Sequence, residues 1–146
     1  MSLTKTKQPF LALSKICLNN WHYIDQKVLS FNDGINIFTG HSGSGKSTVI
    51  DAMQIVLYAN TDGRGFFNKA AADDSDRNLI EYLRGMVAVG EKDEVTYLRN
   101  KNFSTTIVLE FTQTESDEKE CLGVVFDVDT ARNDTSRLFS GTKVAF

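Results

Sequence analysis

The densest group of chemistry-bearing residues lies at positions 40–48. These residues read Gly-His-Ser-Gly-Ser-Gly-Lys-Ser-Thr and fit the phosphate-binding pattern G-x-x-x-x-G-K-[ST] at every fixed position. In this pattern, backbone N–H groups, an ammonium and a hydroxyl together surround a chain of phosphates. The spacing therefore predicts a nucleoside triphosphate site formed by Gly40, His41, Ser42, Gly43, Ser44, Gly45, Lys46, Ser47 and Thr48.

Each residue type in this loop has an expected task. Lys46 supplies a positive charge to the β and γ phosphates, and the hydroxyl of Ser47 is placed to hold Mg²⁺. We expect Thr48 to donate to the α phosphate. Glycine adopts left-handed or crowded backbone conformations that let consecutive N–H groups point at phosphate oxygens, and the loop has three, Gly40, Gly43 and Gly45.

The segments on either side of the loop match the context that a phosphate loop requires. Residues 34–39 start at a turn glycine and continue with β-branched and apolar residues, which predicts a buried strand. After the loop, apolar residues recur at helical spacing, which predicts a helix that begins near Lys46 and adds its N-terminal donors to the site. We expect its polar side, with Ser47, Asp51 and Gln54, to face the nucleotide. This context argues against a simple Gly/Ser linker.

Composition limits the classes of protein that remain. The chain has 146 residues, 41% of them hydrophobic, which suits one core of ordinary size, and a net charge of −3, which gives no global attraction to nucleic acid. Cys17 and Cys121 are too few for a metal cluster or disulfide framework, and we expect both to be small buried hydrophobes. No apolar run approaches the roughly 20 residues that span a bilayer. We expect a cytoplasmic protein without a membrane segment.

The rest of the chain is predicted to be mostly sheet. Residues 1–9, with the single proline Pro9, read as a loose leader, and residues 10–146 as one structured unit. Two strands, 10–18 and 23–31, precede the loop, and three more are predicted at 95–98, 105–111 and 121–128, with a short helix at 77–83. The pattern then fades and the chain stops at Phe146 as an apolar stretch begins. We therefore expect part of a larger domain.

Hydrolysis requires an acidic residue for Mg²⁺ in addition to the phosphate loop. The apolar residues 124–126 followed by Asp127 offer one candidate, which would make the chain a self-contained small P-loop kinase or NTPase. However, residues 121–128 pair more naturally with residues 105–112 as an antiparallel hairpin, and we favour that interpretation. A third alternative is a non-hydrolysing, nucleotide-gated interaction module.

Several stretches together resemble a known family. Asn20-Trp21, residues 31–36 (Phe-Asn-Asp-Gly-Ile-Asn) and residues 40–52 resemble the N-terminal ATPase lobe of SMC-like proteins, nearest to the MukB and SbcC-like group. Residues 58–71 and 78–85 look like the JetC group, the SMC-like subunits of bacterial Wadjet plasmid-defence systems. The likeness covers most of residues 10–130.

This resemblance implies an α/β fold, namely a partial P-loop NTPase of the ABC/SMC head type whose N-terminal lobe carries an antiparallel β subdomain. It implies ATP and Mg²⁺ as cofactors, and a motor that extrudes DNA, organises chromosomes or acts in plasmid defence at the nucleoid. The implied partners are the protein's own C-terminal head lobe, a second head in a homodimer, kleisin-like and accessory subunits, and DNA. In the family, the acid-ended strand, the signature loop and the Mg²⁺-contacting glutamine lie further along, after a coiled coil and hinge, so we do not expect this chain alone to turn over ATP.

Two further groups of residues have two interpretations each. In ATPases of the ABC type an initial antiparallel pair contributes residues near the adenine, which makes Asn20, Trp21, His22 and Tyr23 candidates for a base-side wall. The alternative, which we favour because large aromatic residues mostly serve packing, is that Trp21 and Tyr23 are core anchors. Arg64, in a glycine-bearing loop with Lys69, is a candidate for a γ-phosphate or nucleic-acid contact or belongs to an ordinary surface loop. Arg99 and Lys101 are further scattered cations.

Overall fold

The computed structural model describes residues 9–58, 79–89, 95–132 and 134–144. Its elements in chain order are β1 (Leu11–Trp21), β2 (Ile24–Ser30), α1 (Lys46–Tyr58), α2 (Leu79–Arg84), β3 (Met86–Val89), β4 (Val95–Tyr97), β5 (Phe103–Gln113), β6 (Lys119–Asp129) and β7 (Asp134–Val144). The candidate leader, apart from Pro9, and the Arg64 loop lie outside the described residues.

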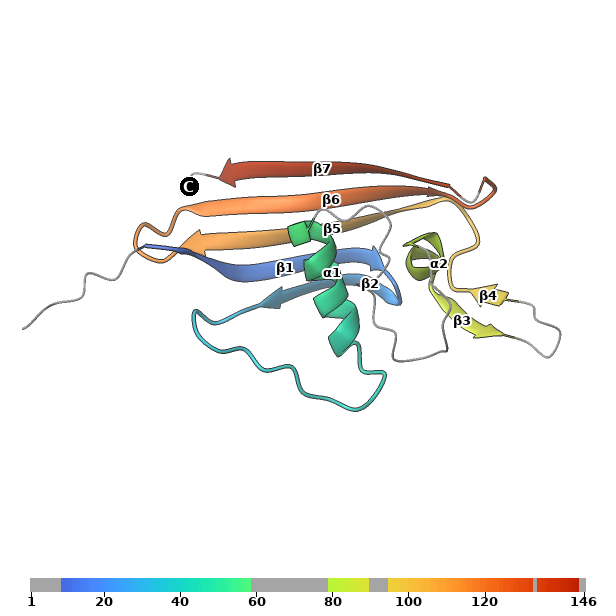
Figure 1. Cartoon of the computed structure of the whole chain (residues 1–146), viewed down its shortest axis with the longest axis horizontal. Coiled ribbons are helices and arrows are strands. Elements are labelled where there is room, and N and C mark those ends of the chain that lie inside the picture. Colours follow the sequence, from blue (N-terminus) through green and yellow to red (C-terminus); the bar gives the residue numbers. More distant parts are fainter. Residues whose placement is uncertain (1–8, 59–78, 90–94, 133, 145–146) are drawn as a thin grey trace, which may run out of the picture.

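A five-stranded antiparallel sheet forms the centre of the molecule (Figure 1). Its strand order is β2-β1-β5-β6-β7, and β3 and β4 form a separate short hairpin. The predicted pairing of residues 105–112 with 121–128 is confirmed, because β5 and β6 are antiparallel partners with Ile107 opposite Val124. The sequence pattern missed β7, which pairs with β6 along its whole length. Its polar composition is acceptable at a sheet edge, where fewer side chains are buried.

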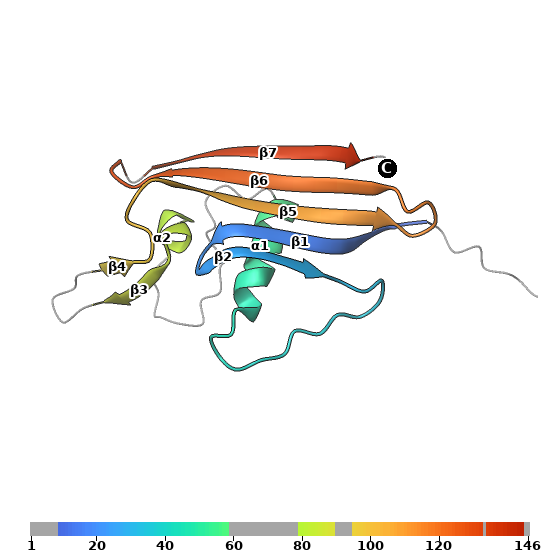
Figure 2. The same cartoon turned by 180° about the vertical axis from the view of Figure 1, so that it is seen from behind.

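The core lies between α1 and one face of the sheet. The helix runs across the strands on this face, and the opposite face has no described helix over it (Figures 1 and 2). Alternate residues of β1, β5 and β6 point to α1, as a half-covered sheet requires. The buried apolar side chains at this contact are Ile16, Leu18, Ile107, Leu109, Val124 and Phe126 from the sheet and Ala52, Ile55 and Val56 from the helix. Full burial of each large one contributes about 1.5–3 kcal/mol.

The predicted strand over residues 34–39 is wrong in this structure. The backbone from Asn32 to Gly40 contains neither strand nor helix, and the side chains of Ile35 and Ile37 are 87% and 79% exposed. A strand is stabilised by backbone hydrogen bonds to a neighbour, and none of the described strands lies beside this segment. Apolar composition alone therefore did not produce a strand.

The two cysteines are half-buried and free. Cys17 lies between the inward-facing residues Ile16 and Leu18, so its side chain points to the face away from α1, and the pairing register places Cys121 on that same outer face. Strand β5 separates β1 from β6. Because neighbouring strands are about 4.8 Å apart, Cys17 and Cys121 are too far apart for a disulfide.

On the outer face of the sheet, Glu110 of β5 has three polar neighbours. The Ser14 hydroxyl donates to its Oε1 at 2.9 Å, and the amino groups of Lys15 and Lys119 lie 3.5 and 3.7 Å from the same oxygen. Burial, the largest single effect, raises the pKa of Glu110, but the hydrogen bond and the two lysines together bring it below its ordinary value. The ionised form therefore stabilises β1, β5 and β6 against one another.

Replacing Glu110 with Gln should lower stability at neutral pH but not in acid. Because the folded pKa of Glu110 is depressed, its contribution is present above the ordinary glutamate pKa of about 4.3 and is lost as pH falls through the folded value. We expect Glu110→Gln to cost up to about 1 kcal/mol at pH 7, as partly exposed ion pairs do, and nothing at pH below about 3. Urea unfolding, followed by the fluorescence of the single tryptophan, measures the difference.

Glu115→Gln, in the exposed turn between β5 and β6, is the matched control and should leave stability unchanged at both pH values. A Glu110→Gln deficit that is equally large at pH 7 and pH 3 would show that the change acts through packing and not through the charge.

Candidate nucleotide-binding loop

The predicted phosphate loop is an exposed bend that leads directly into α1. Its three glycines all have positive φ angles, 151° at Gly40, 79° at Gly43 and 91° at Gly45. The Ser44 N–H donates to the carbonyl of His41, and the Val49 N–H donates to the carbonyl of Gly45 as the first turn of the helix closes. The expected positive φ angles of the three glycines and the start of the helix at Lys46 are confirmed.

Lys46 folds back over the loop. Its Nζ donates to the carbonyls of Gly40 and His41, at 2.7 Å each, and to the Ser44 hydroxyl at 3.1 Å. The ammonium is therefore held within the bend, beside the backbone of the residues expected to bind phosphate. Ser47 follows it and is only partly buried, so its hydroxyl remains near the surface at the start of α1.

Of the four residues in the candidate base-side wall, Tyr23 lies against the loop. A side-chain carbon added at Gly45 would overlap the Tyr23 hydroxyl, so the two residues are in close contact. The ring of His22 meets that of Tyr23 edge-on, with centroids 5.0 Å apart. Tyr23 remains partly exposed, so its ring is accessible from solvent at the edge of the loop.

Trp21 faces the interior instead, which corrects its assignment as a base-side residue, whereas Asn20 is partly exposed and bonds to β5. The Trp21 side chain has no exposed surface, and its Nε1 donates to the carbonyl of Thr48 at 2.8 Å. The side-chain amide of Asn20 donates to the backbone carbonyl of Ser104. The backbone carbonyl of Asn20 accepts from the Thr105 hydroxyl at 2.7 Å. The core-anchor interpretation therefore holds for Trp21, which supports the first turn of α1 from below.

Sequence reasoning missed a polar contact behind the loop. The Tyr82 hydroxyl, from α2, donates to Oδ2 of Asp51 at 2.8 Å, and Asp51 is only 4% exposed. Asp51 thus points into the protein and not, as predicted, toward the nucleotide. Burial, followed by the charge of Asp51, raises the pKa of Tyr82 far above its ordinary value, while a hydrogen bond with the Thr48 side chain acts in the opposite direction. No local pattern links residues 31 positions apart, so this contact carried no signal in the sequence.

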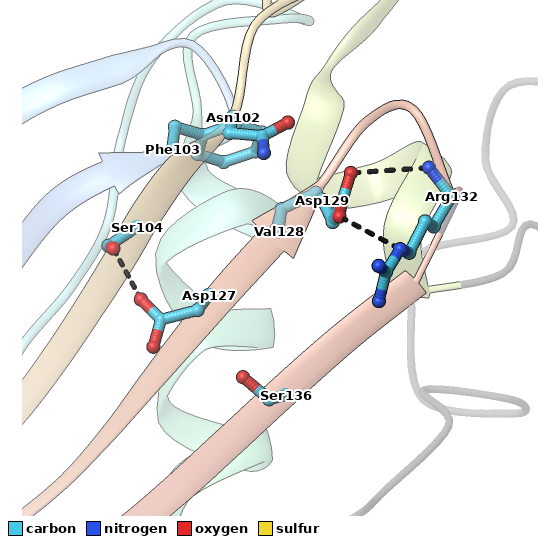
Figure 3. A pocket seen from close by; sticks show the side chains of 8 residues that line it. All are labelled: Asn102, Phe103, Ser104, Asp127, Val128, Asp129, Arg132 and Ser136. Atoms are coloured by element: carbon cyan, nitrogen blue, oxygen red, sulfur yellow. Dashed lines mark hydrogen bonds and ion pairs between the residues drawn. The ribbon is translucent and has the colours of Figure 1, made fainter.

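Asp127 lies on the face of the sheet away from the loop. Its neighbours Phe126 and Val128 are buried on the face that α1 covers, so the alternation of β6 turns Asp127 outward. There it accepts a hydrogen bond from the Ser104 hydroxyl (Figure 3). The surrounding pocket, about 480 Å³, is lined by Asn102, Phe103, Ser104, Asp127, Val128, Asp129, Arg132 and Ser136. The alternative that Asp127 is the Mg²⁺ acid is therefore not supported.

The described residues contain no cluster of three or more His, Cys, Asp or Glu side chains arranged to hold a metal. For Mg²⁺ the relevant donor is Ser47, which offers one oxygen, and this suits an ion that takes its remaining ligands from phosphates and water. None of the helices in the described part of the chain is long and apolar enough to cross a membrane.

Comparison with known proteins agrees with this geometry. Residues 13–74 match the family described as the P-loop containing region of AAA domain, and the match includes the whole loop and α1. Residues 13–74 are thus similar to a P-loop region, and the match covers less than half of the chain. The predicted fold class, an α/β P-loop lobe with an antiparallel sheet, is therefore confirmed.

Two curated proteins and one solved structure show similarity. The chain is 38% identical over 45 residues to the DNA repair protein RecN of Synechocystis, covering 31% of this chain and 8% of RecN. It is 34% identical over 50 residues to the DNA double-strand break repair Rad50 ATPase of Thermoplasma acidophilum, covering 34% of this chain and 6% of Rad50. A structure from work on the ATP-driven dimerisation and DNA-stimulated activation of SMC ATPases has a TM-score of 0.49 at 18% identity, over 92% of this chain and 72% of that one. The matches thus span less than a tenth of either curated relative.

Alanine at Gly45 should disturb the loop more than alanine at Gly43. Both positions have positive φ, which costs a non-glycine residue about 1–2 kcal/mol, but only at Gly45 would the added carbon overlap Tyr23; at Gly43 it has no neighbour within 4 Å. We expect Gly43→Ala to weaken binding of a fluorescent ATP analogue about 5- to 20-fold, and Gly45→Ala to weaken it further. Equal losses would show that the Tyr23 side chain moves away from the added carbon at no cost in affinity.

Proposed function

We propose that this chain binds ATP and Mg²⁺ at residues 40–48 and forms part of an SMC-like ATPase that acts on DNA. The observation that carries the proposal is the position of the Lys46 ammonium, held inside a loop whose three glycines have the backbone conformations of a phosphate cradle. The two curated relatives are, by their names, a DNA repair protein and a DNA double-strand break repair ATPase.

Each group at the loop has a proposed role in binding. The backbone N–H groups of Gly43 and of residues 45–48 surround the phosphates, since the first N–H groups of a helix have no partner within it, whereas the Ser44 N–H stays bonded to the His41 carbonyl. Lys46 exchanges its loop carbonyls for phosphate oxygens, and Ser47 contributes one oxygen to Mg²⁺. Thr48 contributes its N–H, because its hydroxyl is engaged with Tyr82. Tyr23 is the remaining candidate for contact with the base.

Hydrolysis on this proposal requires a second part of the ATPase. Residues 35–39 form neither strand nor helix, their two isoleucines are exposed, and none of the described strands pairs with them. A strand from the protein's own C-terminal head lobe would pair with them and bring the missing acidic residue. A second head would then close over the two ATP molecules, as the resemblance to SMC-like proteins implies.

We further propose that the full-length protein acts on DNA in the cytoplasm. It would do so by loop extrusion with kleisin-like subunits or in plasmid defence, as in the JetC group. This proposal does not rest on Arg99 as a DNA contact. The side chain of Arg99 is only 13% exposed, donates to the carbonyls of His22 and Leu83, and lies 3.8 Å from Asp25. Arg99 therefore joins the β1–β2 turn to α2 and is not available to a phosphate backbone.

Lys46→Ala in the full-length protein should abolish ATP turnover. Loss of the only ammonium among residues 40–48 removes charge stabilisation that grows as the phosphate bond breaks, so we expect a fall in kcat of at least about 100-fold. Phosphate release measures this effect. Lys27→Ala, on the exposed part of β2, is the control and should retain full activity. Unchanged turnover in Lys46→Ala would overturn the proposed function.

Asp127→Asn should leave turnover within about twofold of wild type. The Asp127 carboxylate lies on the outer face of the sheet, opposite to the face that α1 covers, and it bonds to Ser104. The same phosphate-release measurement decides the matter. A fall of tenfold or more at an unchanged melting temperature would identify Asp127 as a catalytic acid and support a self-contained NTPase.

A further inference from the structure

A buried polar contact ties α2 to the first turns of α1. Tyr82 is almost fully buried, and its ring packs against those of Trp21 and His22, with centroids 5.1 and 4.9 Å away. Within this aromatic surrounding, its hydroxyl meets Asp51 at 2.8 Å and forms a hydrogen bond with the Thr48 side chain. A phenol and a carboxylate both lose solvation on burial, so their interaction with each other is strong.

The donors and acceptors in this contact can be assigned. Thr48 and Asp51 are three residues apart and therefore lie on the same face of α1. The single Tyr82 proton goes to Asp51, so the Thr48 hydroxyl is the donor in its own bond with Tyr82. The Thr48 carbonyl is held in addition by the Trp21 indole at 2.8 Å. Thr48 is thus fixed at both its side chain and its backbone, from the core side of the helix.

The N-terminal end of this helical turn carries the proposed phosphate donors. Thr48 directly follows Ser47, and the N–H groups at the start of α1 have directions set by how the helix is rotated and placed. Small displacements of positioned groups reduce binding and rate strongly, since a shift of about 1 Å can cost about 100-fold. Whatever fixes Thr48 therefore also fixes the donors beside it.

We propose that Tyr82 is a positioning residue for the phosphate loop, whose hydroxyl sets nucleotide affinity by holding Thr48 and Asp51 of α1 in place. This inference rests on the proposed function at residues 40–48. Tyr82 acts from α2, which is remote in sequence from the loop, and it does not touch the nucleotide. The Thr48 hydroxyl serves as an anchor for the helix and does not bind the α phosphate.

The test compares Tyr82→Phe with Tyr97→Phe in the full-length protein. The first change removes the buried hydroxyl and keeps the ring on Trp21. The second removes the hydroxyl of a partly exposed tyrosine whose ring lies under the Arg84 guanidinium at 3.9 Å. By calorimetric titration with Mg²⁺, we expect Tyr82→Phe to weaken ATP and ADP binding by the same factor, about 3- to 10-fold, and Tyr97→Phe to weaken neither. The factor is shared because the displaced donors serve phosphates that both nucleotides have.

A melting temperature lowered by Tyr82→Phe, with both dissociation constants unchanged well below that temperature, would overturn the proposal and leave Tyr82 a purely structural role. Loss of ATP binding alone would also overturn it, because that loss points to the γ phosphate and Lys46. Failure of the wild-type protein to bind either nucleotide would instead overturn the proposed function.

A double-mutant cycle with Thr48→Val tests the path of the effect. If the Thr48 hydroxyl acts through Tyr82, the double variant Tyr82→Phe/Thr48→Val binds ATP no more weakly than the weaker single variant. If Thr48 donates directly to phosphate, the two losses multiply, and the assigned role of Thr48 is overturned. Thr48→Val alone also serves as the test should Tyr82→Phe fail to fold, and unchanged ADP affinity in Thr48→Val would then contradict the proposal.

Discussion

The first turn of α1 must satisfy two opposing requirements. To bind phosphate as proposed, its backbone N–H groups have to stay open toward solvent, while the helix itself has to be fixed to the sheet. The structure meets both by anchoring the turn from one side only. The Trp21 indole holds the Thr48 carbonyl, and Ala52 and Ile55 bury the next turn against the strands. The exposed side is thereby left free for Lys46 and Ser47.

The conformation of the loop could be predicted from the sequence because it is local. Nine consecutive residues contain the glycines, the ammonium and the hydroxyl, and the backbone conformations at Gly40, Gly43 and Gly45 follow from what glycine alone tolerates. The β5–β6 hairpin was equally accessible, since alternating residues and a short acidic turn specify its register. In both cases the partners lie close together along the chain.

The parts that could not be predicted depend on distant partners. Composition favoured a strand at residues 34–39, but a strand also needs a neighbour, and a single segment does not reveal whether one is present. The sequence indicated a surface carboxylate at Asp51, but in the structure α2 brings the Tyr82 hydroxyl into contact with it. The role of Trp21 changed for the same reason, because an aromatic residue after a strand is compatible with either a ligand or a helix as its partner.

The exposed isoleucines at residues 35–39 affect how separate copies of the chain behave toward one another. This segment contains no charged residue, and its isoleucines and backbone are open to any other extended chain, which is the condition under which strands join edge to edge and polypeptides aggregate. The Asn36 side chain shortens the stretch that can pair with another chain, because it bonds to both the N–H and the carbonyl of Asn32 and bends the backbone there. A copy in which residues 35–39 stay uncovered therefore exposes a short stretch through which chains can associate.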